Sequence, residues 1–172
     1  MKLTVEKAGA ADLDALERLF DELCEYLAAT VNYPGWEKGR YPVRAVAEEA
    51  LAADQLYVAR LDGQVVGTVT LNHAEPPAYA DAAWEVRSAV AVVHTLAVHP
   101  SFLHSGTGRA MMAYAVNWAK AQRCRAIHLD TYEKNIPAKR LYESLGFRFC
   151  GKIDLGYAAW GRAWYDAYEL IL

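Results

Sequence analysis

An amide and a phenol stand seven positions apart, at Asn135 and Tyr142, in a segment with the signals of a short helix. Asn135 is a helix-capping residue type, Pro137 suits a first turn because it needs no N–H there, and Gly146 suits a helix end. Because seven residues make almost two turns, both polar side chains project from one face. The small Ala138 leaves room between them, which favours a groove. An ordinary capped helix with a packed tyrosine is the alternative.

A second segment, residues 90–109, has the pattern of a strand, a loop and a helix. Val90–Val98 is apolar and β-branched, as buried strands are, and a His-Pro pair follows it. The loop then carries Gly106 and Gly108 at the start of a helix with an apolar stripe. Backbone N–H groups and the helix dipole bind phosphate at such a position, and glycine allows close approach. Two glycines alone could also form a simple tight turn.

Two nucleotide-binding motifs fit this loop poorly. A mononucleotide P-loop needs Gly-Lys followed by Ser or Thr, whereas Gly108 is followed by Arg109 and Ala110. A dinucleotide motif needs a third glycine and a strand near the N-terminus, and this loop lies well beyond the middle of the chain. Neither motif accounts for the loop.

Taken together, the two segments resemble the GCN5-related N-acetyltransferase (GNAT) superfamily. Its acyl-CoA signature, Arg/Gln-x-x-Gly-x-Gly/Ala, is matched by Leu103 to Gly108, and its Leu-Ala-Val-His-Pro strand motif by Leu96 to Pro100. The later family motif, Asn-x-x-Ala-x-x-x-Tyr-x-x-x-Gly-Phe, is matched in full by Asn135, Ala138, Tyr142, Gly146 and Phe147. The main departure is Leu103, where the family usually carries Arg or Gln, and His104 stands where glycine is frequent.

The hydrophobic pattern predicts the order β-α-α-β-β-β-α-β-α-β-β, an α/β protein with a mixed sheet and helices on both faces. Strands are expected at 2–7, 56–61, 65–71, 90–98, 126–129, 148–153 and 164–171, a helix capped by Asp12, a second helix at 43–53, and loops at 31–42 and 73–87. The resemblance implies a GNAT-like acyl-CoA N-acyltransferase fold in which the fourth and fifth strands splay apart. A single N-acetyltransferase domain over residues 1–172 is the corresponding expectation.

The composition limits the classes of protein to which this chain can belong. The 172 residues are 54% hydrophobic and 23% charged, which is typical of one globular domain with a genuine core. A net charge of −3 without a dense Lys/Arg tract argues against a nucleic-acid partner. No long apolar run or signal peptide is evident, which predicts a cytoplasmic protein without a membrane partner. Three cysteines without ligand spacing predict reduced thiols and no metal.

The resemblance implies that acetyl-CoA is the cosubstrate and that an amine of a small molecule, amino acid or peptide accepts the acetyl group. The pantetheine arm would pair with the backbone of one strand, as in strand addition. The residues expected to bind acetyl-CoA are Leu96, Ala97, Val98, Leu103, His104, Ser105, Gly106, Thr107, Gly108, Arg109, Asn135, Ala138 and Tyr142. Homodimers are common among proteins of this family, although no residue here compels one.

Direct attack by the amine needs a general acid and a route for the ammonium proton. By motif match Tyr142 is the acid that protonates the departing thiolate; a purely positioning role for its hydroxyl is the alternative. His94 is the first candidate base, because it lies two residues before Leu96 on the expected strand and both side chains therefore face the same side of the sheet. A histidine that simply packs in the core is the alternative. Glu85, Glu75 or a water path would serve otherwise.

The acceptor side of the site is less specified by the sequence. Aromatic and acidic residues near the expected acceptor loops are candidates, since an ammonium group is attracted by aromatic faces and carboxylates. These residues are Trp36, Tyr41, Trp84, Glu85 and Asp130. Asp130 and Glu133 could hold the amine or cap the loop, and the sequence leaves both uses open. A protein that binds acyl-CoA without catalysis, as a sensor or interaction module, is the rival hypothesis, because Leu103 departs from the signature and no base is certain.

Overall fold

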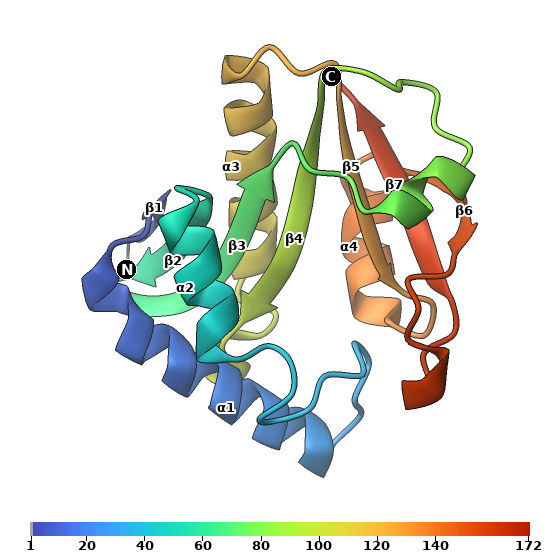
Figure 1. Cartoon of the computed structure of the whole chain (residues 1–172). Coiled ribbons are helices and arrows are strands. Elements are labelled where there is room, and N and C mark those ends of the chain that lie inside the picture. The colour runs from blue at the N-terminus through green and yellow to red at the C-terminus, as the bar shows by residue number, and fades with distance from the viewer. Residues whose placement is uncertain (1) are drawn as a thin grey trace. The chain divides into compact units, whose positions relative to one another are not determined.

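The computed structural model describes residues 2–172 and contains a seven-stranded sheet in the order β1-β2-β3-β4-β5-β7-β6 (Figure 1). The strands are β1 (Leu3–Lys7), β2 (Leu56–Leu61), β3 (Gln64–Asn72), β4 (Val90–Val98), β5 (Ala126–Tyr132), β6 (Arg148–Ile153) and β7 (Tyr165–Ile171). The helices are α1 (Leu13–Ala29), α2 (Arg44–Ala52), α3 (Thr107–Ala121) and α4 (Ile136–Ser144). The predicted α/β class and element order are confirmed, including a mixed sheet in which β4 runs parallel to β5.

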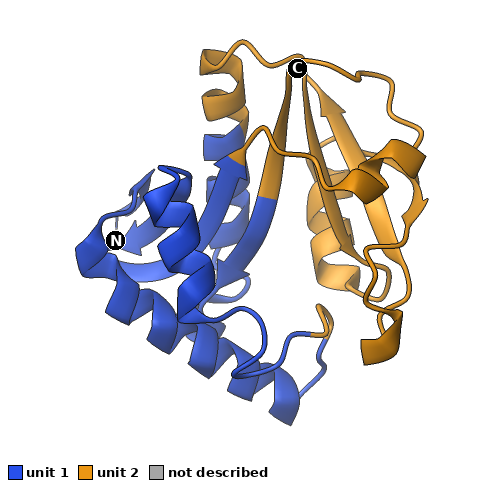
Figure 2. Cartoon of the chain, viewed as in Figure 1, with its two compact units in different colours: residues 1–32, 36–71, 94–115 blue, residues 33–35, 72–93, 116–172 orange. Residues whose placement is uncertain are grey.

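The chain forms two compact units (Figure 2). Unit 1 comprises the chain up to Asn32 together with residues 36–71 and 94–115, and unit 2 comprises residues 33–35, 72–93 and 116–172. Strand β4 and helix α3 each contribute residues to both units. The glycine loop at residues 103–109 therefore belongs to unit 1, and Tyr142 belongs to unit 2.

In unit 1, helices α1 and α2 bury their apolar stripes with residues of the sheet. Leu16, Phe20 and Leu23 of α1 form one hydrophobic cluster with Ala47 of α2 and Val58 of β2. This spacing of apolar residues along α1 is the helical stripe that the sequence predicts. Burial of such a stripe, at about 25 cal/mol for each Å² of apolar surface, is the main force that holds a helix of this kind to a sheet.

In unit 2, strand β5 lies between β4 and β7. It pairs in parallel with β4 over Val90–Val92 and antiparallel with β7 along its full length, from Ala126↔Ile171 to Tyr132↔Tyr165. Because side chains alternate along a strand, His128, Asp130 and Tyr132 share one face of β5. This face receives the segment between β3 and β4, whose Tyr79 and Trp84 form a hydrophobic cluster with Tyr132.

Two local expectations need correction. Asp12 does precede α1, but its carboxylate accepts the N–H of Gly9 and binds Arg60, and it makes no side-chain cap to the helix. The segment at residues 73–87 is more than a surface loop, since it contains a 3-10 helix at Pro77–Asp81 and buries Tyr79.

No helix in residues 2–172 is long and apolar enough to cross a membrane.

Candidate active site

Asn135 ties the start of α4 to the neighbouring strand. Its Oδ1 accepts the N–H of Ala138 at 3.4 Å, and its Nδ2 donates to Oγ1 of Thr131 on β5 at 3.0 Å. The predicted helix cap is thus confirmed, and the amide is engaged at both ends by the protein itself. The structure gives Asn135 a positioning role: it sets the helix that carries Tyr142.

Tyr142 lies buried on α4, with only 5% of its surface exposed. Its ring packs against Phe147 and Tyr168, with ring centroids 5.8 and 6.1 Å away. The alternative of a packed tyrosine therefore describes this residue better than an open groove does. Burial first, and then the negative charge of Asp130, raise the pKa of Tyr142 well above its ordinary value of 10.0. The phenol consequently holds its proton at neutral pH, which a general acid requires.

Asp130 lies on β5 and forms one hydrogen bond, with the hydroxyl of Tyr79, which donates to its Oδ2 at 2.7 Å. Burial raises the pKa of Asp130, and the Tyr79 hydrogen bond offsets part of this rise. Tyr79 is 1% exposed, so its hydroxyl is fixed in place by packing. The sequence proposed Asp130 and Tyr142 separately. Within unit 2 the two residues interact electrostatically, since the negative charge of Asp130 adds to the effect of burial on the pKa of Tyr142.

Two positions before Asp130, His128 is fully buried between two carboxylates. Its Nδ1 lies 2.5 Å from Oε1 of Glu75, and its Nε2 lies 3.1 Å from Oε1 of Glu169. The Trp84 ring stacks on the imidazole with a centroid distance of 3.9 Å and an angle of 9°. Both ring nitrogens therefore lie within hydrogen-bond distance of a carboxylate oxygen, which fixes the orientation of the ring.

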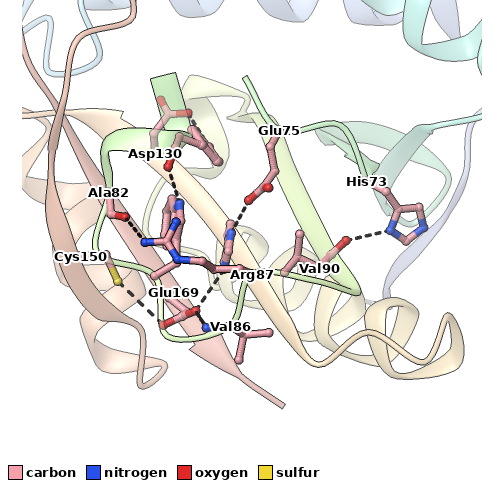
Figure 3. Close-up of polar contacts among 12 residues, drawn as sticks. His73, Glu75, Ala82, Val86, Arg87, Val90, Asp130, Cys150 and Glu169 are labelled. Carbon is pink, nitrogen blue, oxygen red and sulfur yellow. Dashed lines mark hydrogen bonds and ion pairs between the residues drawn. The ribbon is translucent and has the colours of Figure 1, made fainter. Parts of the chain in front are cut away.

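Glu169 gathers further partners on the same face of the sheet. Its Oε1 accepts the N–H of Val86, and the Cys150 thiol also points to the carboxylate (Figure 3). Arg148 donates to its Oε2 at 2.6 Å. Burial alone would raise the pKa of Glu169, but the backbone N–H groups, Arg148 and His128 together hold it below its ordinary value. Sequence reasoning missed Glu169 and His128; a charged residue at an inward position of an apolar strand was the available signal.

These contacts place two residues that the sequence proposed for the acceptor. Trp84 is 7% exposed, and its indole N–H donates to the carbonyl of Tyr79, so it is a core residue of unit 2. Glu85 is exposed, and its backbone N–H donates to Glu169. Glu75, the other acidic candidate base, is engaged by His128. The Trp84 ring is therefore not open to an acceptor molecule, and the candidate base Glu75 is already hydrogen-bonded to His128.

The loop before α3 has the backbone that phosphate binding needs. Gly106 (φ 87°) and His104 (φ 61°) both adopt left-handed conformations, which explains why glycine is frequent at the His104 position in the family. The Gly106 carbonyl accepts the N–H of Ala110, so the helix begins here with its first N–H groups directed outward. Open space surrounds the Gly106 Cα, since nothing would lie within 4 Å of an added Cβ. These residues fit a pyrophosphate group.

Side chains also brace this loop. The Ser105 hydroxyl donates to the Phe102 carbonyl at 2.5 Å and lies 2.8 Å from the Thr107 hydroxyl. Leu103 is partly buried and brings no charge, so positive charge beside the loop comes from the exposed Arg109 and from the helix dipole.

Strand β4 has an irregularity at Thr95, where φ is 48°. A β-branched residue in this conformation is strained and breaks the alternation of side chains. The sequence argument that His94 and Leu96 share one face assumed a regular strand, and that premise is wrong here. The Thr95 hydroxyl lies 2.5 Å from that of Tyr41, whose ring meets Trp36 edge-on at 5.8 Å.

Tyr41 therefore lies beside β4 within unit 1, and Trp36 lies next to Tyr41. His94 belongs to unit 1 as well and is partly buried. Leu96, Ala97 and Val98 follow the irregularity, and Ala97 is buried while its two neighbours are partly exposed.

Residues 16–147, more than half of the chain, match the acetyltransferase (GNAT) family, and the protein belongs to this family. A relative named mycothiol acetyltransferase, from Acidothermus cellulolyticus, is 32% identical over 111 residues, which make up 63% of this chain and 34% of that protein. The chain spans 33% to 49% of the length of the curated relatives it matches.

Solved structures share the fold. A GNAT-family acetyltransferase from Streptococcus agalactiae 2603 has a TM-score of 0.78 at 18% identity, covering 99% of this chain and 95% of that one. The yncA protein of Salmonella typhimurium, solved with its cofactor acetyl-CoA, has a TM-score of 0.66 at 18% identity, covering 99% and 94%. The predicted GNAT fold is thereby confirmed.

Proposed function

We propose that this protein transfers the acetyl group of acetyl-CoA to a primary amine of a small molecule, amino acid or peptide. Tyr142 carries the proposal: it occupies the position of the family motif and is a buried phenol that keeps its proton. The whole of residues 1–172 would act as one N-acetyltransferase domain.

Acetyl-CoA supplies an activated acetyl thioester and a pyrophosphate group by which it can be held. The N–H groups of residues 106–109 and the Arg109 side chain would bind the pyrophosphate, since glycine leaves the backbone of Gly106 open. The backbone of Leu96 to Val98 would pair with the pantetheine arm, and a main-chain N–H near Leu96 would donate to the thioester oxygen as it gains charge.

Proton transfer is divided between two groups. Tyr142 would donate its proton to the departing thiolate, as a fixed phenol can do. His94, or a path through water, would take the proton that the ammonium group must lose before its nitrogen can attack. Because Thr95 turns the strand after His94, the direct and the water-mediated route both remain part of the proposal.

The identity of the acceptor does not follow from the relatives. They are named for mycothiol, for spermine and spermidine, and for streptothricin, which are different molecules. The proposal therefore stays with the primary amine as the acceptor group.

The first test is calorimetric titration of the ligand-free protein with acetyl-CoA, with CoA, NAD and ATP as comparisons. We expect micromolar binding of acetyl-CoA and CoA alone, and then release of free thiol when spermine, lysine or an N-terminal alanine peptide is added. Equal binding of ATP or NAD would overturn the assignment of the loop. Binding of acetyl-CoA with no transfer to any amine would favour the non-catalytic acyl-CoA-binding module.

A further inference from the structure

Asp130, which is partly buried, differs from the acidic side chains that are fully buried. Asp12 binds Arg60, Asp166 lies near Lys139 and Lys152, and Glu169 binds Arg148 and His128. Within residues 2–172, no Lys, Arg or His side chain forms an ion pair with Asp130, whose one hydrogen-bond partner is the neutral hydroxyl of Tyr79. Buried carboxylates are normally paired with positive charge, because an unpaired one is costly to bury.

The surroundings of Asp130 suit a positive charge. Burial is the main cause of the raised pKa of Tyr79, Tyr142 and Tyr165, and the negative charge of Asp130 adds to it in each case. Aromatic faces attract ammonium groups, and more strongly where water is excluded. Tyr79 binds only Oδ2, so Oδ1 remains for a further donor.

Asp130 is partly buried, and its Oδ1 is not among the fully buried side-chain atoms that lack a hydrogen-bond partner in residues 2–172, so this oxygen keeps some contact with solvent. A carboxylate with one oxygen fixed by a buried phenol and the other open is arranged to receive a charged donor.

We propose that Oδ1 of Asp130 binds the ammonium group of the acceptor, so that the enzyme selects amines that are positively charged in solution. This inference rests on the proposed acetyl transfer and names its substrate class. Tyr79 is the positioning residue, because it holds the carboxylate from the opposite side. Neutral amines such as aromatic anilines would be poor acceptors for the same reason.

The test compares Asp130→Asn with Asp54→Asn. Both changes remove one negative charge by the same substitution, but Asp54 is exposed and pairs with Lys7. Asparagine keeps an oxygen for the Tyr79 hydroxyl and loses only the charge. With spermine, lysine and the N-terminal alanine peptide, we expect Asp130→Asn to lower kcat/KM at least tenfold for every amine that the wild type acetylates. Acetyl-CoA affinity should change by less than twofold, and Asp54→Asn should match the wild type.

A second measurement needs no acceptor. If Asp130 is kept for a ligand, its unpaired charge stabilises nothing in the free protein, so Asp130→Asn should leave the melting temperature unchanged or raise it. A fall of several degrees would make Asp130 a structural residue and overturn the inference. Unchanged kcat/KM in Asp130→Asn, with an active wild type, would also overturn it while leaving acetyl transfer intact. Failure of the wild type to bind acetyl-CoA would instead refute the proposed function.

Discussion

His128 and Asp130 are two positions apart on β5 and share one face of the strand, yet their surroundings are opposite. Both nitrogens of His128 meet carboxylates, and a tryptophan ring covers its face. Asp130 meets one phenol and no cation within residues 2–172. Both ring nitrogens of His128 therefore have a hydrogen-bond partner, whereas the Asp130 carboxylate has one partner within the described residues.

The contrast suggests that neighbouring residues of one strand serve different purposes, His128 in stability and Asp130 in function. A completed buried network holds its elements in place, here the segment at residues 73–87 against β5 and β7. An ionisable group that lacks some of its partners makes the protein less stable than it could be, and groups of this kind are concentrated at functional sites. Neither type of residue is distinguished by its identity, since both are ionisable side chains in an apolar strand. Three substitutions and one pH dependence test this comparison.

Tyr142→Phe should have the largest effect. Removing the hydroxyl takes away the proposed acid and keeps the ring between Phe147 and Tyr168, so kcat should fall by about 10²-fold to 10⁴-fold, as the loss of general acid catalysis does. Steady-state kinetics with acetyl-CoA and the best amine measure this effect. Calorimetry should find the same affinity for CoA. A kcat within threefold of the wild type would limit Tyr142 to a positioning role.

Glu169→Ala should be the most destabilising change at the completed network. It leaves Arg148, His128 and the N–H of Val86 without their shared acceptor, and breaking a buried charge network of this kind costs about 3–5 kcal/mol. Urea denaturation followed by circular dichroism measures the free energy of unfolding. Asp54→Asn, which breaks the exposed pair with Lys7, is the control and should have little effect. Equal stability of the two variants would contradict the role assigned to the network.

Asn135→Ala should have an intermediate effect on stability. The change removes the cap of α4 and the bond to Thr131, and the loss of a helix cap costs about 1 kcal/mol. Because the helix carries Tyr142, kcat should fall as well, while the pH dependence of kcat stays the same. Asn135→Asp, which can still accept the Ala138 N–H, should recover most of the stability. If aspartate restored neither stability nor kcat, capping would not be the function of this residue.

The smallest effect concerns alkaline pH. The pKa of Tyr142 is raised in the folded protein, so the unfolded chain loses this proton first, near its ordinary pKa of 10.0. The contribution of this residue to stability is therefore complete below pH 10 and declines as pH rises above it. The melting temperature should fall between pH 9 and pH 11, and it should fall less in Tyr142→Phe. A steeper fall in the phenylalanine variant would show that the sign is wrong.

Local sequence signals predicted most of the fold. The hairpin of β2 and β3, the cap of α4 and the buried run of β4 were all read from short-range patterns, because turns, caps and hydrophobic periodicity depend on neighbours in the chain. The irregularity at Thr95 was not predicted, since threonine has no preference for positive φ and only the surrounding structure can impose it.

Motif spacing likewise found the glycine loop and Tyr142, because both lie within segments whose residues act through one helix. It could not rank Trp84, Glu85 and Asp130, which looked alike as candidates for the acceptor. In the structure Trp84 is a core residue and Glu85 is exposed. Of these three residues, Asp130 is the one whose charge acts on Tyr142.

By itself, the sequence determined the class of fold, the family and the helix that carries the phenol, because these follow from residue types at fixed local spacing. Only the tertiary structure decided that His128 is completed by Glu75 and Glu169, and that Asp130 is left with Tyr79. These partners lie 41 to 53 positions apart in the chain. Charge pairing over such separations depends on strand register and on the path of a loop, which no local pattern encodes.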